Sequence, residues 1–121
     1  MLELLDNLPD NVVGVRATGW VGAHDYTSVL MPAVDAVIAR HPKVRVLYQV
    51  GPEFLGFTPG AVWDDMKLGL SHYRAWEKVA VVTDVTWIAM ATQAFFFAMP
   101  CPTKVFPLAE QSQALDWLLE D

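Results

Sequence analysis

The acidic and histidine side chains of this chain do not gather at spacings that support acid–base or metal chemistry. Asp64 and Asp65 are adjacent, so they point about 100° apart on a helix, and we expect them to stabilise its first turn rather than to converge on a substrate. His24, His41 and His72 belong to three different predicted elements, and none has a second histidine or a cysteine at metal-ligand spacing. The pattern indicates no metal site and no cofactor.

The possible nucleophiles are equally isolated. Cys101 lies between two prolines and has no histidine near it in the sequence, so nothing is in place to activate its thiol. Ser28, Ser71 and Ser112 do not occur in the Gly-x-Ser-x-Gly arrangement of a nucleophile elbow. Without a nucleophile paired to a base, we expect a protein that is not an enzyme.

The segment 51–60, which reads Gly-Pro-Glu-Phe-Leu-Gly-Phe-Thr-Pro-Gly, is the first candidate binding site. It is predicted to be a loop after a central parallel strand, and ligands of open α/β sheets bind beside the carboxyl ends of such strands. It lacks the Gly-Lys-Ser/Thr sequence of a phosphate-binding loop. Aromatic side chains beside carboxylates suit a protein partner or an amphipathic ligand, unless the phenylalanines fold back over the sheet edge. The residues of interest are Glu53, Phe54, Phe57 and Thr58, followed by Trp63.

The second candidate is a predicted helix over 87–99 that carries no charge. No charged residue lies between Asp84 and Lys104, and the helix includes Trp87 and Phe96 among its large apolar residues. A helix that is apolar almost all round must be buried or in contact with something. Three interpretations remain open: coverage by neighbouring elements, an interface with a second copy or a partner, and a surface for a lipid-like ligand.

The elements that position these residues alternate between strands and helices. Runs of β-branched residues predict strands, and apolar residues at helical spacing predict helices. We expect strands over 11–21, 44–50, 78–83 and 104–107, a short edge strand at 2–5, and helices over 23–40, 61–75, 87–99 and 108–119. Pro32 lies inside the first helical pattern, where it either belongs to the true first turn or kinks the helix.

The predicted order is β-β-α-β-α-β-α-β-α. Strands that alternate with helices imply right-handed crossovers and parallel pairing, whereas the first two strands resemble a hairpin. The order therefore predicts an α/β fold with a mixed, mostly parallel sheet and helices on both faces. We expect one domain over 1–121, because domains most often contain ~100–150 residues.

Composition narrows the class of protein further. The chain has 54% hydrophobic residues, a net charge of −6 and a single cysteine. The apolar content excludes a disordered chain, and the acidic balance argues against binding to nucleic-acid phosphates. The N-terminus lacks the basic region of a secretory signal, and no apolar run reaches the ~20 residues of a membrane span. We expect a cytoplasmic protein.

Several segments resemble the SpoIIAA-like family. Residues 62–84 contain a helical pattern W-x-D-x-K-x-G-x-x-H that begins at Trp63 and leads into a strand that reads Lys-Val-Ala-Val-Val-Thr-Asp. Trp87 then opens the next helix, Phe106 ends a strand, and Ala-Leu-Asp-Trp-Leu at 114–118 matches the terminal helix. The resemblance implies a fold similar to STAS domains, the module of anti-sigma-factor antagonists and sulfate transporters.

The resemblance also implies a mode of action. STAS proteins act by protein–protein binding, which is switched by phosphorylation of a serine in an Asp-Ser-Ser/Thr-Gly motif after the third strand. The corresponding segment here, 54–60, has no Asp-Ser pair, and Thr58, followed directly by Pro59, is its one possible phosphate acceptor.

Two functions follow as hypotheses. The first is a non-enzymatic module that binds a protein partner, or itself as a homodimer, through 53–58 and the helix over 87–99. The second is a carrier of a small apolar or lipid-like ligand in a cleft between the sheet and the helices over 61–75 and 87–99.

Overall fold

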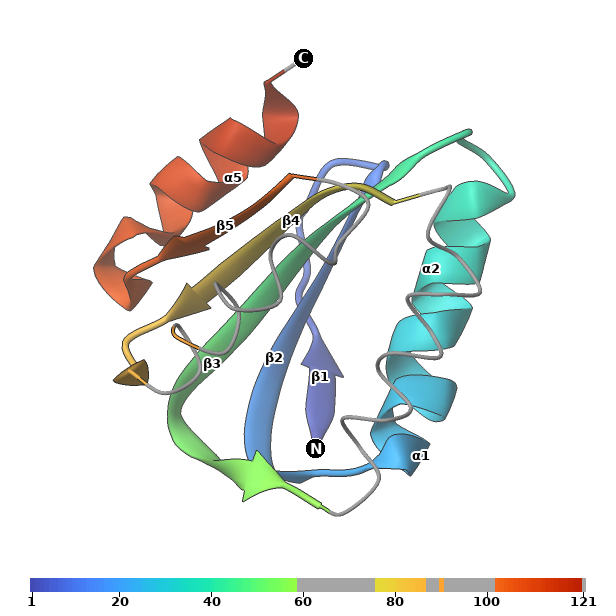
Figure 1. The fold of residues 1–121 in the computed structure, drawn as a ribbon. Helices are drawn as coiled ribbons and strands as arrows, with labels where there is room; N and C mark the ends of the chain where they lie inside the picture. Colours follow the sequence, from blue (N-terminus) through green and yellow to red (C-terminus); the bar gives the residue numbers. More distant parts are fainter. Residues whose placement is uncertain (59–75, 87–89, 91–101, 121) are drawn as a thin grey trace.

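A five-stranded sheet forms the centre of the described structure. The structure is a computed structural model, and it describes residues 1–58, 76–86, 90 and 102–120. Figure 1 shows the strands in the spatial order β1-β2-β3-β4-β5. Their bounds are Leu2–Leu4, Val12–Val21, Val44–Phe57, Trp76–Thr83 and Thr103–Phe106. β1 runs antiparallel to β2, and the other neighbours are parallel, so the predicted mixed, mostly parallel sheet is confirmed.

The first helical region is built in three stages. A short α1, Ala23–Asp25, continues into a π-helical turn, Tyr26–Leu30, and then into α2, Met31–Ile38. Pro32 lies in the first turn of α2. Proline is tolerated there because its missing N–H would have no partner within the helix. The wider π-helical turn before it therefore accommodates a residue that would break a continuous α-helix.

The two described helical layers cover opposite faces of the sheet (Figure 1). α2 packs Val34 and Val37 into a core with inward-facing residues of β2, β3 and β4. On the other face a short 3-10 turn, Leu108–Glu110, leads into α5, Gln111–Leu119. Ala114 and Leu118 of α5 pack against Leu47, Ala80 and Val82. Helices on both faces, as predicted, are confirmed for these elements.

The prediction of a loop over 51–60 is wrong for most of its length. β3 continues through Gly51 and Pro52 to Phe57 because β2 also extends and supplies a pairing partner. The register joins Gly19 to Phe54 and Val21 to Phe57, with one irregularity between Ala17 and Gly19 and a second between Gly19 and Trp20. The glycine and proline that suggested a loop therefore fall where the pairing register shifts.

Other strand ends differ from the predictions by one or two residues. β4 begins at Trp76 rather than at Lys78, and β5 runs from Thr103 to Phe106. The helices predicted over 61–75 and 87–99 lie almost entirely outside the described residues, and so do Trp63, Trp87 and Phe96. Met90, which is described, has an exposed side chain.

Candidate functional site

β2 and β3 continue together beyond the rest of the sheet. The last residue pair between β3 and β4 joins Val50 to Thr83. Beyond that pair, segment 51–57 of β3 lies beside segment 19–21 of β2, and the register joins Gly19 to Phe54, Trp20 to Gly56 and Val21 to Phe57. We call these two segments the β2–β3 extension. Within the described part of the chain, no strand pairs with 51–57 on the side away from β2.

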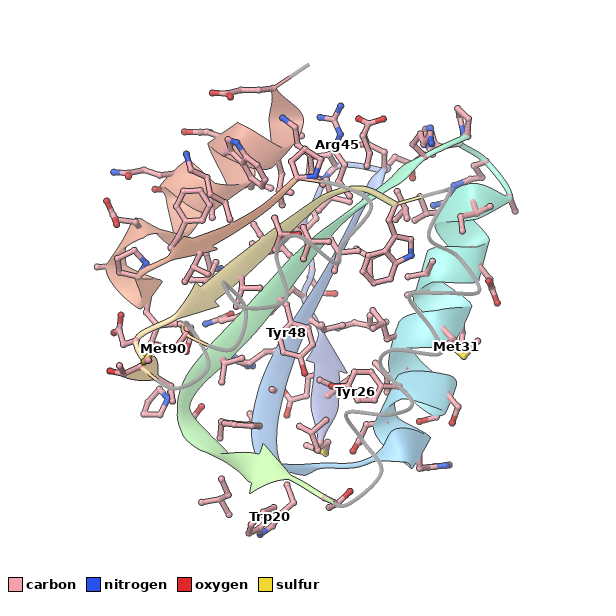
Figure 2. The ribbon with its side chains drawn as sticks, in the orientation of Figure 1. Trp20, Tyr26, Met31, Arg45, Tyr48 and Met90 are labelled. Carbon is pink, nitrogen blue, oxygen red and sulfur yellow. The ribbon has the colours of Figure 1, made fainter. Side chains whose placement is uncertain are left out.

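A tryptophan ring lies over the backbone of this extension. Trp20 is 60% exposed, although it is one of the largest apolar side chains in the protein. Its register partner is Gly56, which has a φ of 152°. A Cβ placed on Gly56 would be 2.8 Å from Trp20 Cζ3. Gly56 is therefore required both by its backbone conformation and by the close approach of the ring. Figure 2 shows Trp20 at the far end of the extension, away from the helices.

The sequence-predicted residues of this segment divide between the core and the surface. Glu53 is exposed, as expected for a contact residue, and its neighbour Leu55 is 66% exposed. Phe54 is half-buried and packs against the core beneath α2, so it follows the interpretation in which a phenylalanine folds back onto the sheet. The backbone of Phe57 is part of β3, and its side chain lies outside the described structure.

Thr58 follows the extension directly and is held against β2. Its N–H donates to the carbonyl of Val21 at 2.9 Å, and its hydroxyl donates to the same carbonyl at 3.4 Å. The hydroxyl and the carboxylate of Asp25 both lie beside Gly22, at 3.0 and 4.0 Å from the position that a Cβ would take there. A phosphate on Thr58 would therefore be placed near a carboxylate, where like charges repel.

Two tyrosines connect the helical layer to the sheet near this end. The hydroxyls of Tyr26, in the π-helical turn, and Tyr48, in β3, lie 3.1 Å apart, and the two side chains point toward each other (Figure 2). Tyr26 is buried. A buried hydroxyl costs free energy unless it is hydrogen-bonded. The bond to Tyr48 therefore holds the π-helical turn at one position along β3. It thereby orients the segment in which β2 leads into α1.

His24 and His41 take part in local hydrogen bonds, the first through its backbone and the second through its ring. The backbone carbonyl of His24 accepts a hydrogen bond from Ser28, whereas His41 Nε2 lies 3.0 Å from the carboxylate of Asp10. The hydrogen bond with His41, together with the charge of Arg40, lowers the pKa of Asp10 from its ordinary value of 3.8. The described residues contain no group of three potential metal ligands. His72, Asp64 and Asp65 lie outside those residues.

Sequence reasoning missed the two most exposed apolar residues of the extension, Trp20 and Leu55. A signal for Trp20 was available: along a strand, side chains alternate between faces, so a buried Val21 implies an outward-facing Trp20. Leu55 had no comparable signal, because its segment was expected to be a loop.

Among the described helices, none has the length and apolar character needed to cross a membrane.

Comparisons with known proteins agree with this architecture. The SpoIIAA-like family matches residues 12–119. One similar solved structure is that of an uncharacterized protein from the DUF3478 family, with a SpoIIAA-like fold, from Shewanella loihica PV-4. Its sequence identity is 27% and its TM-score 0.77, and the alignment covers 98% of this chain and 92% of that one. No curated protein matches the chain. The resemblance noted in the sequence is confirmed, and the chain belongs to the SpoIIAA-like family, whose fold is that of a STAS-like module.

Proposed function

We propose that the protein is a non-enzymatic binding module that acts by protein–protein interaction through the β2–β3 extension. The observation that supports this proposal is the exposure of Trp20 and Leu55 on neighbouring strands, beside Glu53 and a strand edge that no described strand covers. Single exposed apolar residues are ordinary. A tryptophan whose ring packs closely against the backbone of Gly56 is different, because that contact restricts the ring, which then loses less conformational entropy on binding.

The acidic side chain contributes selectivity rather than affinity. Glu53 lies two positions from Leu55 in the same strand, and both side chains are exposed. A partner with an apolar anchor and a cation at matching spacing would satisfy both residues. Charges at the rim of an interface mainly affect association rates and the choice of partner. The partner is therefore a protein surface or a second copy of this chain.

Photo-cross-linking tests this proposal. A photoreactive amino acid in place of Trp20, introduced in the native host, should yield a cross-linked protein of defined mass. The same group in place of Leu119, an exposed apolar residue of α5, provides the matched control. The purified cross-linked protein should bind Trp20→Ala about 30-fold more weakly than wild type, as expected for an interface hot spot of about 2 kcal/mol. Equal cross-linking at both positions, or equal affinity for both forms, would contradict the proposal.

The module acts, in this proposal, without a phosphorylation switch at Thr58. The hydroxyl already donates to Val21, and Asp25 lies close to the place where a phosphate would be added. Incubation with host-cell extract and labelled ATP should leave Thr58 unlabelled. Stoichiometric labelling at this residue would restore the switch.

The single cysteine, Cys101, supports the reducing cytoplasm as the place of action.

Carriage of a small apolar ligand is the second candidate. A groove of about 350 Å³ lies between α2 and the connection from β1 to β2. Its lining combines apolar residues such as Leu5, Leu8 and Val37 with the charged residues Asp10 and Arg40. Its size is near the lower limit for small-molecule sites, about 300 Å³. It differs from the cleft expected beside the helices over 61–75 and 87–99. Native mass spectrometry of freshly purified protein should reveal a retained ligand, and repeated ligand-free spectra would exclude the carrier.

A further inference from the structure

Trp20 and Trp117 differ in what surrounds their rings. The ammonium groups of Lys78 and Lys104 lie 5.0 and 5.8 Å from the centre of the Trp117 ring. Trp20 is 60% exposed, and no lysine or arginine among the described residues lies over its ring. The face of a tryptophan ring is the best aromatic acceptor for a cation. Trp20 therefore offers a cation acceptor that the described part of the chain does not fill.

The backbone of β3 holds the indole of Trp20 in place. Three ring atoms, Cζ3, Cε3 and Cη2, lie within 3.5 Å of the position that a Cβ would take on Gly56. All three belong to one side of the six-membered ring, so the contact leaves most of the indole accessible to a partner. A ring that is restricted before binding loses less conformational entropy when a cation binds to it.

The charged side chains around this ring are acidic. Residues 18–25 and 51–58 include Asp25 and Glu53 but no lysine or arginine. Asp25 is already engaged, because its Oδ2 accepts from the amide of Gly22 at 2.8 Å and lies 3.9 Å from the N-terminal ammonium. Glu53 is exposed, and no described residue forms an ion pair with it. Charge at this surface therefore favours a cationic group of a partner over an anionic one.

The ring and the unpaired carboxylate are separated along β3. Glu53 precedes Gly56 by three residues, or about 10 Å at ~3.4 Å per residue. Its Oε2 lies 3.8 Å from the position of a Cβ on Gly51, so the carboxylate is directed toward the start of the extension. A single cation therefore cannot contact both groups. Two cations three or four positions apart in an extended segment cover this distance.

We propose that Trp20 binds an arginine side chain of a basic, extended segment of a partner protein, and that Glu53 binds a second cation of the same segment. This inference rests on the proposed function, because it specifies the chemistry of the partner that the β2–β3 extension takes. The planar guanidinium stacks on the accessible part of the indole. Tryptophan and arginine are both enriched at interface hot spots. The ion pair with Glu53 contributes mainly to the association rate and to the choice of partner.

Peptide titration followed by NMR tests the inference on the full chain. The probe is the peptide acetyl-Gly-Arg-Ser-Leu-Ser-Arg-Gly-amide, in which the two arginines are four positions apart. The control peptide has citrulline in place of both arginines, which keeps the shape of the side chains and removes their charge. The arginine peptide should shift the indole N–H signal of Trp20 but not that of Trp117, whose ring already has two lysines over it. The citrulline peptide should bind about tenfold more weakly.

Three variants of the chain separate the two contacts. Trp20→Leu keeps an exposed apolar side chain but removes the aromatic face, so it should weaken binding of the arginine peptide about five- to tenfold. Glu53→Gln should weaken it about threefold and reduce its dependence on salt. Asp6→Asn makes the same change of charge at an exposed residue between β1 and β2, and it should leave the affinity unchanged. Equal affinity for both peptides, or wild-type affinity in Trp20→Leu, would overturn the inference, and wild-type affinity in Glu53→Gln would overturn its second contact.

The outcomes distinguish this inference from the proposed function. If a protein cross-links through Trp20 but the two peptides bind alike, the extension binds a partner without a cation and only this inference is wrong. If the arginine peptide binds as expected and no protein cross-links, the cation site is present and the proposed function is wrong. A Trp20 signal that moves with protein concentration alone would place a second copy on this surface and overturn the basic partner.

Discussion

Replacement of Arg45 by alanine should cause the largest loss of stability among the charged residues that the structure describes. Arg45, in β3, is only 8% exposed. Its Nε donates to Glu77 Oε1 at 2.7 Å, and its Nη1 donates to the carbonyls of Leu118 and Glu120, the latter at 3.1 Å. These carbonyls belong to the end of α5, where the last turn of a helix leaves its acceptors without intrahelical partners. Arg45 thus attaches the C-terminal helix to the centre of the sheet.

The magnitude follows from these contacts. A hydrogen bond to a charged group contributes ~1.5–3 kcal/mol, and loss of one member of a buried ion pair costs ~3–5 kcal/mol. Glu77 is partly exposed, so water can solvate its carboxylate when the guanidinium is removed. Lys78 also donates to the carbonyl of Glu120, so it keeps part of the helix end attached to the sheet when Arg45 is replaced. We therefore expect Arg45→Ala to lower the free energy of unfolding by about 3 kcal/mol.

Urea denaturation followed by circular dichroism measures this loss, and hydrogen exchange locates it. The amides of the last turn of α5 should exchange faster in Arg45→Ala, while those of β2 follow the global stability. Arg16→Ala is the control, because the Arg16–Glu3 pair is 3.0 Å long with both side chains about 40% exposed, and such pairs contribute below about 1 kcal/mol. If the two variants lose the same stability within error, Arg45 does not anchor the helix.

Three further predictions concern other described contacts. Gly56→Ala should lower the free energy of unfolding by about 1–3 kcal/mol in a urea titration, because Gly56 has a positive φ and the new Cβ would lie 2.8 Å from Trp20 Cζ3. An unchanged indole NMR signal of Trp20 in this variant would argue against that contact. Leu118→Ala should cost about 2–5 kcal/mol in the same titration, because Leu118 is fully buried. Because the pKa of Asp10 is lowered in the folded state, its ionised carboxylate stabilises the fold above pH 3.8, and this stabilisation is lost as the pH falls through the folded-state pKa. Since the hydrogen bond with His41 is the main cause, the carbon-13 titration midpoint of Asp10 should rise in His41→Ala.

The sequence predicted most of the sheet because its strands carry strong local patterns. Within the strand predicted over 78–83, Val79 to Val82 form a continuously apolar run, as expected for a strand covered on both faces, and the structure buries all four residues. Pro32 could not be placed from the sequence, since the two interpretations differ only in where the helix begins. The structure places the proline in the first turn of α2, after a π-helical turn that has no distinct sequence signature.

The site was harder to predict because it depends on pairing between distant residues. Glycine and proline in 51–60 are locally typical of a loop, yet Phe54 and Phe57 are strand residues because 19–21 lies alongside them. Such tertiary pairing overrides local propensity. The same pairing decides between the two interpretations of Phe54, which packs partly into the core, as expected if a phenylalanine folds back onto the sheet.

The β2–β3 extension carries features that limit unspecific strand pairing beside the proposed interaction surface. A strand that extends beyond its neighbour normally exposes backbone and apolar side chains to aggregation, and proteins limit this with charges, prolines or bends. Pro52 and Glu53 provide two of these devices at the start of the extension, and Gly56 provides a bend at its end. Between them, Leu55 has no such protection on an edge that no described strand covers. A single exposed leucine is ordinary by itself, so its part in the proposed function depends on the exposed Trp20 of the neighbouring strand, which a partner would cover together with it.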